Sequence, residues 1–358
     1  MAAEVGEGNC IGYAARDQSG FLSPFKFNRR EVGPKDVRIR ITHCGICHSD
    51  LHQAKNEWGG SLYPMVPGHE IVGMVEAVGA EVSKIAVGQR AGIGCMVDSC
   101  RMCQACKAHV EQFCPGCIYT YNKEDPKSPT GEPTQGGYSS YYVCDEDFVL
   151  SIPDKLSSQE AAPLLCAGIT VYSPMAFYGA NQPGMRLGVV GLGGLGHMAV
   201  KFGKAFGMEV TVLSTSPSKE KEAKDVLGAD QFIVTKDAES MEAAAGSLDA
   251  IVDTVSAQHE LGPYLDLLTF NGKMILIGIP PEPYKLHATQ LLMGRKTVAG
   301  TLIGGIKETQ EMLDFSAEKG VAPMIEVIDI QDLNKAYDRL AKSNVKYRFV
   351  IDVEKSLK

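Results

Sequence analysis

The first part of the chain shows the short-period alternation of apolar and polar residues that is typical of β-strands. Residues Asp36–Ile41 alternate as in a strand with one buried face. The segment Gly68–Gly79 is bounded by glycines and predicts a pair of strands. Residues Cys95–Cys117 have little apolar periodicity, and a loop rich in Pro, Gly and Lys follows at Asn122–Gly137. We therefore expect a β-rich region of short strands and loops.

Beyond about Cys166 the pattern changes to apolar runs that alternate with helical periodicity. The run Leu187–Val190 leads into a glycine-rich turn and a helical pattern at His197–Phe206. Further strands are predicted at Met208–Leu213, Phe232–Val234, Ala250–Val252 and Met274–Ile277. This alternation predicts an α/β fold with a doubly wound parallel sheet. The last part predicts helix, strand, helix and strand at Lys307–Glu318, Met324–Ile328, Asp332–Lys342 and Arg348–Asp352.

Charge and composition narrow the classes of function. The net charge is −8 and no basic block occurs, which argues against a nucleic-acid partner. No stretch approaches the roughly 18 consecutive apolar residues of a membrane span. The first residues, MAAEVGEGNC, lack the features of a secretory signal or a transit peptide. We expect a cytoplasmic protein with no membrane partner.

Eleven cysteines are many for a cytoplasmic chain, in which disulfides are rare, so clustered thiols favour a metal site. Four of them follow the spacing C-x2-C-x2-C-x7-C, which lets the sulfurs converge on one ion: Cys100, Cys103, Cys106 and Cys114. Four thiolates close a tetrahedral zinc shell, so this zinc would be structural. An iron–sulfur cluster or unligated cysteines are the alternatives.

The strand Leu187–Val190 runs into a G-x-G-G-x-G turn and then a helix, which is the context of a dinucleotide fingerprint: Gly191, Leu192, Gly193, Gly194, Leu195 and Gly196. A tight turn without a ligand is the alternative. An NAD site would carry an acidic residue about 20 positions further on. The next strand instead ends in hydroxyl residues and a lysine, which could bind a 2′-phosphate: Ser214, Thr215, Ser216 and Lys219. NADP(H) is therefore the predicted cofactor, unless this is a solvated Ser-rich turn.

A second set of metal-type side chains lies in CGICHSDLH, from Cys44 to His52, and in the tripeptide Gly68-His69-Glu70. A catalytic zinc needs three protein ligands and one open position, where it acts as a Lewis acid on an oxygen. Each of these residues alone would more often be structural.

These motifs together resemble the medium-chain zinc-dependent alcohol dehydrogenases. The strings NEWGGSLYPMVPGHEIVG, PTQGGYSSYYV, EAAPLLCAGITVYSPM and GGIKETQEMLDF are similar to the plant cinnamyl alcohol dehydrogenase branch, over essentially the whole chain. The resemblance implies that Cys47, His69 and Cys166 hold a catalytic zinc, with Glu70 as an alternate or adjacent carboxylate. Two zinc ions per chain would follow, one catalytic and one structural.

The resemblance also implies roles for residues around the metal. Ser49 and His52 would form the proton path, since alcohol oxidation releases a buried proton and imidazole exchanges protons near neutral pH. An ordinary surface imidazole is the alternative for His52. Further cofactor contacts would come from Ser49, Thr170, Thr254, Gly278, Thr301, Leu302 and Ile303. The substrate pocket would be lined by Gln53, Trp58, Cys95, Tyr119 and Leu302.

Two pocket positions depart from the branch. Tyr119 stands where a tryptophan is common, and Leu302 where a phenylalanine is common. Pocket contacts decide specificity, so the chemistry carries over better than the substrate. The expected function is zinc-dependent interconversion of aldehydes and primary alcohols, cinnamyl-type, other aromatic, allylic or terpenoid. An iminium or conjugated-alkene reductase on the same scaffold is the alternative, and a non-enzymatic regulatory protein is a more distant one.

The length of 358 residues suits two domains. The resemblance implies a GroES-like, zinc-binding catalytic domain from residues 1–166 and 305–358, and a Rossmann cofactor domain from residues 167–304. It further implies a homodimer joined through the Rossmann sheets, around Met274–Ile277 and Thr297–Leu302.

Overall fold

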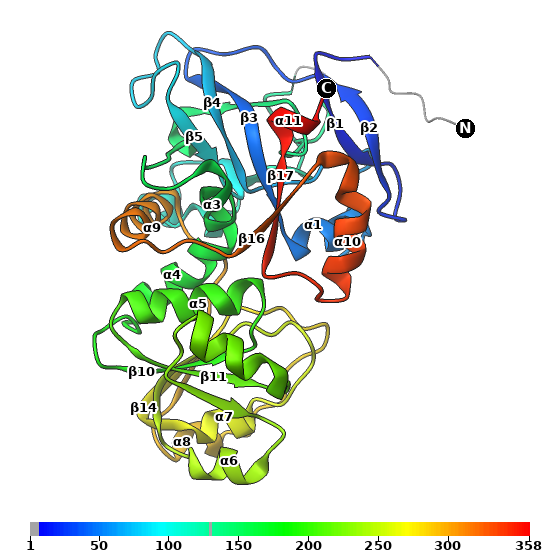
Figure 1. The fold of residues 1–358 in the computed structure, drawn as a ribbon. Coiled ribbons are helices and arrows are strands. Elements are labelled where there is room, and N and C mark those ends of the chain that lie inside the picture. The colour runs from blue at the N-terminus through cyan, green and yellow to red at the C-terminus, as the bar shows by residue number, and fades with distance from the viewer. Residues whose placement is uncertain (1–6, 129–130) are drawn as a thin grey trace. The chain divides into compact units, whose positions relative to one another are not determined.

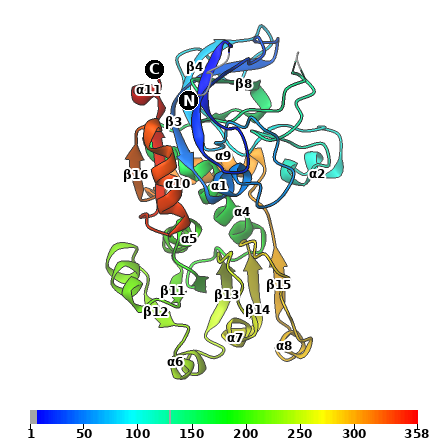
Figure 2. The ribbon, with the colours of Figure 1, turned by 90° about the vertical axis from the view of Figure 1, so that its right-hand side faces the viewer.

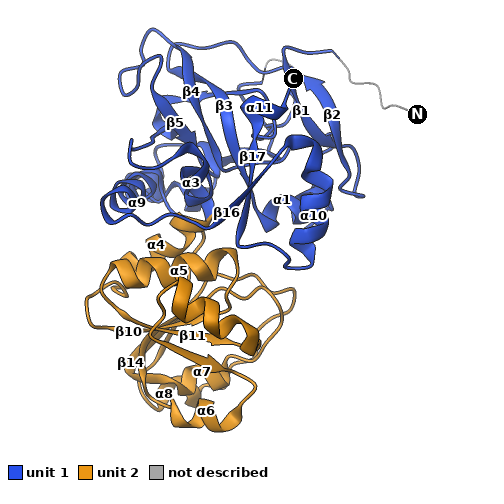
Figure 3. Ribbon diagram, in the orientation of Figure 1, with its two compact units in different colours: residues 1–166, 304–358 blue, residues 167–303 orange. Residues whose placement is uncertain are grey.

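The computed structural model of the chain describes residues 7–128 and 131–358. The chain forms two compact units, which Figure 3 distinguishes by colour. Unit 1 contains residues 1–166 and 304–358, and unit 2 contains residues 167–303.

Unit 1 is built on a sheet of seven strands in the order β16-β17-β3-β4-β5-β9, with β8 also paired to β3 (Figure 1). The hairpin β1-β2 and the pair β6-β7 lie outside this sheet. The strands are β1 (Cys10–Ala15), β2 (Leu22–Phe27), β3 (Asp36–Ile46), β4 (Ile71–Val78), β5 (Arg90–Ile93), β6 (Met96–Asp98), β7 (Ile118–Tyr119), β8 (Tyr141–Asp145), β9 (Leu150–Ser151), β16 (Ile325–Ile328) and β17 (Arg348–Asp352).

The α-helices of unit 1 are α1 (His48–Ala54), α2 (Gln104–Lys107), α3 (Ser158–Pro163), α9 (Ile306–Lys319), α10 (Leu333–Ala341) and α11 (Val353–Ser356). The core gathers apolar residues from the central strands and from α10, among them Ile39, Ile71 and Phe349. The alternating segment that begins at Asp36 forms β3, which extends to Ile46 and pairs with β4, β8 and β17. The residues that follow β3 therefore begin at the end of a strand that three neighbours fix in place.

The predicted strand pair at Gly68–Gly79 is wrong. The structure has one strand there, β4, in which Gly73 lies opposite Ile41. A Cβ on Gly73 would lie 2.0 Å from the carbonyl oxygen of Arg40. This glycine therefore lets two backbones approach closely within a strand and does not form a turn.

Unit 2 contains a parallel six-stranded sheet in the order β12-β11-β10-β13-β14-β15. Figure 2 shows β13, β14 and β15 side by side. In chain order within the unit this is 3-2-1-4-5-6, so the predicted doubly wound fold is confirmed. The strands are β10 (Arg186–Val190), β11 (Glu209–Ser214), β12 (Gln231–Val234), β13 (Leu248–Asp253), β14 (Leu268–Leu276) and β15 (Thr297–Gly300).

The α-helices of unit 2 are α4 (Ile169–Phe177), α5 (Gly194–Ala205), α6 (Ala238–Ala243), α7 (Gly262–Asp266) and α8 (Thr289–Leu292). Helix α5 packs on β10 and β11, and the chain enters it directly from the glycine-rich turn. The inner strands are apolar on both faces because helices cover a parallel sheet on both sides. Among the described residues, no helix is long and apolar enough to cross a membrane.

Candidate metal centres and cofactor site

Four buried side chains of unit 1 converge on one point. Cys47 precedes α1, His69 and Glu70 precede β4, and Cys166 lies in a π-helical turn, Leu164–Gly168, that follows α3. One ligand atom from each lies within 4.8 Å of the others. A π-helical turn changes the direction of the side chains within a helix and is frequent at functional sites.

The spacing of these atoms fits zinc. The sulfurs of Cys47 and Cys166 are 3.9 Å apart, and Nε2 of His69 lies 3.2 Å from the sulfur of Cys166. A tetrahedral zinc with ordinary bond lengths separates two sulfurs by about 3.8 Å and a sulfur from a nitrogen by about 3.6 Å. The hydrogen bond with Cys166 lowers the pKa of Cys47 well below its usual range, and burial opposes this less strongly. The same hydrogen bond raises the pKa of Cys166, so of these two thiols Cys47 ionises first.

Glu70 and Arg348 form a buried ion pair beside this group. Burial raises the pKa of Glu70, and the guanidinium of Arg348 opposes this shift and favours the carboxylate. Oε1 of Glu70 contacts Arg348, whereas Oε2 has no hydrogen-bond partner among the described residues. This unsatisfied oxygen fits a carboxylate that can approach a metal. Arg348 also lies 3.9 Å from the sulfur of Cys47.

Asp50 orients the imidazole of His69 and is fully buried. Its Oδ1 accepts hydrogen bonds from Nδ1 of His69 and the N–H of Gly68, both at 3.0 Å. Its Oδ2 accepts from the N–H of Cys47 at 2.9 Å and the Tyr138 hydroxyl at 3.0 Å. Burial disfavours the imidazolium of His69, but Asp50, Cys95 and Cys47 together outweigh burial and raise the pKa of His69. Holding Nδ1–H leaves Nε2 for the metal.

The sequence interpretation missed Asp50 and Arg348. Asp50 is the third residue of α1 and accepts the N–H of the N-cap residue, Cys47, as acidic residues do at helix starts. That spacing was a detectable signal. Arg348 opens a predicted apolar strand, and a charged residue in such a strand suggests a buried partner.

Ser49 and His52 lie one turn apart on α1, so they share a face of the helix. The Ser49 hydroxyl is 3.6 Å from the sulfur of Cys47. Nδ1 of His52 is 2.5 Å from a carboxylate oxygen of Glu57, a residue that sequence reasoning also missed. The ring of His52 packs against Trp58, with centroids 5.0 Å apart. One end of this face is thus at the metal group, and the other reaches an exposed carboxylate.

The other predicted pocket residues are distributed over both units. In unit 1, Gln53 accepts a hydrogen bond of 2.7 Å from the Asn122 amide, and Tyr119 is half exposed at the end of β7. A hydrogen bond with Cys166 lowers the pKa of Cys95, which places Cys95 beside the metal group. Leu302 belongs to unit 2 and is exposed.

The four regularly spaced cysteines also converge, with one sulfur from each within 4.8 Å of the others. The sulfur of Cys106 lies 4.0 Å from that of Cys100 and 3.5 Å from that of Cys103. Backbone N–H groups point at the sulfurs of Cys100 and Cys114, at 3.3–3.4 Å. The N–H groups of Met102 and Cys103 lower the pKa of Cys100 to about 6. Four cysteine sulfurs in this arrangement fit a closed structural zinc site.

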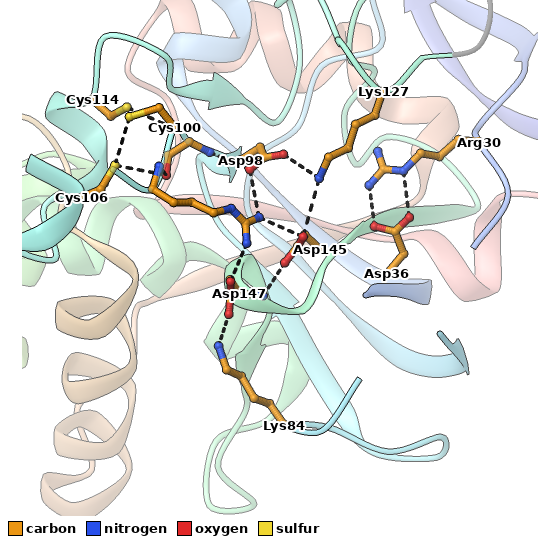
Figure 4. Close-up of polar contacts among 12 residues, drawn as sticks. Arg30, Asp36, Lys84, Asp98, Cys100, Cys106, Cys114, Lys127, Asp145 and Asp147 are labelled. Atoms are coloured by element: carbon orange, nitrogen blue, oxygen red, sulfur yellow. Dashed lines mark hydrogen bonds and ion pairs between the residues drawn. The ribbon is translucent and has the colours of Figure 1, made fainter. Parts of the chain in front are cut away.

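A network of ion pairs fastens this cysteine lobe to the sheet (Figure 4). Arg101, next to Cys100, contacts Asp98 at 3.0 Å, Asp145 at 2.9 Å and Asp147 at 2.6 Å. Lys127 adds a contact of 2.6 Å to Asp98. Asp145 is the last residue of β8, so the lobe is connected directly to the sheet. Most of these side chains are partly exposed, so each pair contributes little and the effect comes from the network.

In unit 2, the glycine-rich turn leaves room that the protein itself does not fill. A Cβ on Gly196 would lie 2.1 Å from the carbonyl oxygen of Gly191, so this glycine is needed for packing. A Cβ on Gly193 would meet nothing within 4 Å. Gly193 is the N-cap of α5, a helix of 12 residues. An open helix N-terminus lined by backbone fits a pyrophosphate.

The predicted 2′-phosphate residues lie beside this turn. Ser214 ends β11, and its hydroxyl accepts the N–H of Ser216 at 3.2 Å. The ammonium of Lys219 donates to the carbonyl of Leu192 at 2.8 Å, and burial lowers the pKa of Lys219. The hydroxyl of Thr254 donates to the carbonyl of Val190 at 2.8 Å. Thr170 is buried in α4, and Thr301–Ile303 follow β15.

Two family descriptions match the chain. The alcohol dehydrogenase GroES-like domain matches residues 33–154, and the zinc-binding dehydrogenase domain matches residues 194–318. A protein of Fragaria ananassa named "Probable mannitol dehydrogenase" is 57% identical over 97% of this chain and 96% of its own length. The 8-hydroxygeraniol dehydrogenase of Catharanthus roseus is 55% identical, with the same shares covered.

Two solved structures are similar along the chain. A cinnamyl alcohol dehydrogenase from Sorghum bicolor has a TM-score of 0.94 and 52% identity, covering 97% of this chain and 98% of its own. A cinnamyl alcohol dehydrogenase from Helicobacter pylori, in complex with NADP(H), has a TM-score of 0.90 and 42% identity, covering 97% and 99%.

Replacing Cys103 by serine should remove the metal of the four-cysteine group. We expect the zinc content to fall from two ions to one per chain, and Tm to fall by about 5–10 °C, because about 2–3 kcal/mol corresponds to this shift in a domain of such size. Zinc analysis and calorimetry measure both. Cys117→Ser is the matched control, since Cys117 is buried nearby but outside the group. An unchanged zinc content in Cys103→Ser would refute the assignment.

Replacing Asp50 by asparagine should weaken the other metal group. The amide offers one oxygen to four donors, so His69 loses its fixed orientation, and we expect zinc affinity to fall about 10–100-fold. Chelator-driven zinc release, followed with a chromogenic chelator, measures this separately from activity. Asp338→Asn on α10, which is exposed, is the control. Equal release rates in all three proteins would show that Asp50 does not support the site.

Proposed function

Because the chain belongs to the medium-chain zinc-dependent alcohol dehydrogenase family, in its cinnamyl alcohol dehydrogenase-like branch, we propose that it reduces aldehydes to primary alcohols with NADPH, and catalyses the reverse reaction with NADP⁺. The observation that carries this proposal is the buried donor set of Cys47, His69 and Cys166, with Glu70 beside it. Two thiolates and one imidazole leave a coordination position open, as catalytic zinc requires.

When bound, zinc would polarise the substrate carbonyl as a Lewis acid, and NADPH would supply the hydride. Cys47, Cys166 and His69 would hold the metal, and Asp50 would keep His69 in its ligating tautomer. Arg348 balances the negative charge of Glu70 and lies near the Cys47 thiolate. These residues keep the group buried and away from bulk water, which strengthens electrostatic interactions inside it.

The proton needed at the product oxygen would come through α1. The Ser49 hydroxyl lies 3.6 Å from the sulfur of Cys47, so it would be the first group of this path at the metal site. His52, one turn further on, would return the proton to Ser49 through its Nε2, since Nδ1 is occupied by Glu57. Glu57 would stabilise the imidazolium while the proton is in transit. The half-exposed position of His52 allows exchange with solvent.

The substrates would be aromatic, allylic or terpenoid aldehydes. Trp58 and Tyr119 offer half-exposed aromatic surfaces in unit 1, and the Trp58 ring packs on the proposed relay residue His52. Such surfaces bind flat or branched apolar groups well.

Unit 2 would bind NADP(H) in preference to NAD(H). Lys219 lies against the glycine-rich turn, and Ser214, Thr215 and Ser216 supply hydroxyls without a carboxylate that would repel a 2′-phosphate. We further propose a homodimer formed through unit 2. Its edge strand β15 is half exposed, and Leu292 and Met293 just before it are 74% and 79% exposed.

The activity is tested with a panel of aldehydes monitored by the oxidation of NADPH. Cinnamyl, benzyl and geranyl-type aldehydes should be reduced at the carbonyl, while His69→Ala should lower kcat/KM by at least about 1000-fold because the metal loses a ligand. NADPH binding to unit 2 should persist in the variant. His287→Ala, an exposed histidine, serves as the control. Products reduced at the carbon–carbon double bond, or full activity in His69→Ala, would contradict the proposal.

Cofactor preference is tested with Lys219→Glu. The new carboxylate repels the 2′-phosphate, so the KM for NADPH should rise about 10–100-fold while that for NADH changes little. Lys221→Glu makes the same change of charge at an exposed position two residues away and should have a small effect. Similar wild-type kcat/KM values for NADPH and NADH would instead argue against the assignment of Ser214–Lys219.

A further inference from the structure

A buried carboxylate at the carboxyl end of β13 connects several loops of unit 2. Asp253 is the last residue of β13 and is 1% exposed. Its Oδ2 pairs with Nε2 of His259 at 2.8 Å, and its Oδ1 accepts the N–H of Val255 at 3.1 Å. Its main-chain oxygen accepts the N–H groups of Ile277 and Gly278, at 3.0 and 3.2 Å. One residue therefore joins the loops that follow β13 and β14.

The ring of His259 faces hydrogen-bond acceptors on both sides. Nε2 faces the Asp253 carboxylate, and Nδ1 lies 2.9 Å from the carbonyl oxygen of Ala257. A neutral imidazole carries one N–H and could satisfy only one of these acceptors, whereas an imidazolium satisfies both. The hydrogen bond with Asp253 raises the pKa of His259, which agrees with this geometry.

Residues 254–256, which follow Asp253, pack closely against the glycine-rich turn. A Cβ on Gly191 would lie 2.7 Å from a methyl group of Val255, and a Cβ on Gly278 would lie 2.2 Å from the Val255 carbonyl oxygen. The hydroxyl of Ser256 accepts the N–H of Ile279 at 3.3 Å. Residues 254–256 therefore fit tightly between the turn that opens α5 and the backbone after β14.

Two aromatic side chains with neutral phenols pack against the imidazole of His259. The rings of Tyr264 on α7 and of Tyr284 meet the imidazole nearly edge-on, with centroids 5.7 and 5.3 Å away. Burial raises the pKa of Tyr264, and it raises that of Tyr284 to about 12, so both phenols stay protonated. Glu260, next in the chain, is exposed. The charge that His259 meets is that of Asp253.

We propose that His259 is a positioning residue for the nicotinamide cofactor, whose imidazolium, paired with Asp253, fixes residues 254–256 against the glycine-rich turn. This inference rests on the proposed binding of NADP(H) at the carboxyl end of the sheet, where doubly wound folds bind their ligands. Loss of the positive charge leaves Asp253 buried without its ionic partner and loosens the segment. NADP(H) affinity therefore depends on the protonation of His259.

The direction of the pH dependence follows from the raised pKa of His259. The imidazolium is present below that pKa, so its contribution to cofactor affinity is complete at low pH. The contribution is lost as pH rises through a value above the ordinary pKa of about 6.5. NADPH should thus dissociate more readily at alkaline pH.

The test compares NADPH binding by wild type and His259→Gln from pH 6 to pH 9, by fluorescence titration. The glutamine amide can donate to Asp253 but carries no charge. The ratio of the variant Kd to the wild-type Kd should fall from about 5–10 at pH 6 to about 1 at pH 9, since a charge-assisted bond is replaced by a neutral one. Titration of Lys219 and the 2′-phosphate cancels in this ratio. At saturating NADPH, kcat should stay within about twofold of wild type, because His259 acts through the cofactor loops.

His287→Gln, which changes an exposed histidine of the same unit, should give a ratio of about 1 at every pH. A ratio for His259→Gln that is pH-independent, or equal to 1 at pH 6, would overturn the inference while leaving NADPH binding by the wild type intact. Failure of the wild type to bind NADPH would instead overturn the proposed function. If His259→Gln does not fold, the nitrogen chemical shifts of His259 in the wild type decide, since neutral-tautomer shifts at pH 6 exclude the imidazolium.

Discussion

The hydrogen bonds of one buried carboxylate, that of Asp50, organise the metal group of unit 1. Burying a charged group away from water costs free energy unless hydrogen bonds within the protein replace its hydration. Asp50 receives four, from Cys47, Gly68, His69 and Tyr138. These donors come from the start of α1, the segment before β4 and the segment before β8. The need to satisfy one carboxylate therefore brings two of the metal ligands together before any metal is considered.

Two other buried carboxylates are also stabilised by polar partners, in these cases by cationic side chains. Glu70 is buried against Arg348, which connects the first residue of β17 to the metal group. In unit 2, Asp253 is buried against His259 and joins the loops at the carboxyl end of the sheet. Removing one member of such a pair leaves an uncompensated buried charge. The partly exposed pairs around Arg101 are different, because water screens them and only their number makes them effective.

The cofactor unit relies on backbone more than on side chains. Gly196 and Gly278 permit contacts that any Cβ would block, at 2.1 and 2.2 Å from carbonyl oxygens. Gly193 is different, because the protein leaves the space beside it open. A pyrophosphate is recognised by N–H groups at a helix start, so the residues that matter there are those without side chains. Lys219 then adds charge at the edge of this backbone site.

The sequence by itself determined the features that local patterns encode. Periodicity predicted the parallel sheet, cysteine spacing predicted a four-sulfur group, and the strand–glycine–helix succession predicted a dinucleotide site. The ligand roles of Cys47, His69 and Cys166 came from family resemblance, because Cys47 and Cys166 are 119 residues apart and no spacing relates them.

Only the tertiary structure decided which charges are buried together. Arg348 meets Glu70 across 278 residues, and Glu57 reaches His52 after the chain turns beyond α1. The same holds for Gly73, where a close approach to Arg40 makes one strand out of a segment that looked like two. Such contacts join segments that are far apart in the sequence. A charged residue within an apolar run indicates that it needs a partner, but the run does not show where in the chain that partner lies. The physical reason is that burial is a property of the folded chain. Burial makes an unpaired charge costly and leaves no room for a side chain at some glycine positions.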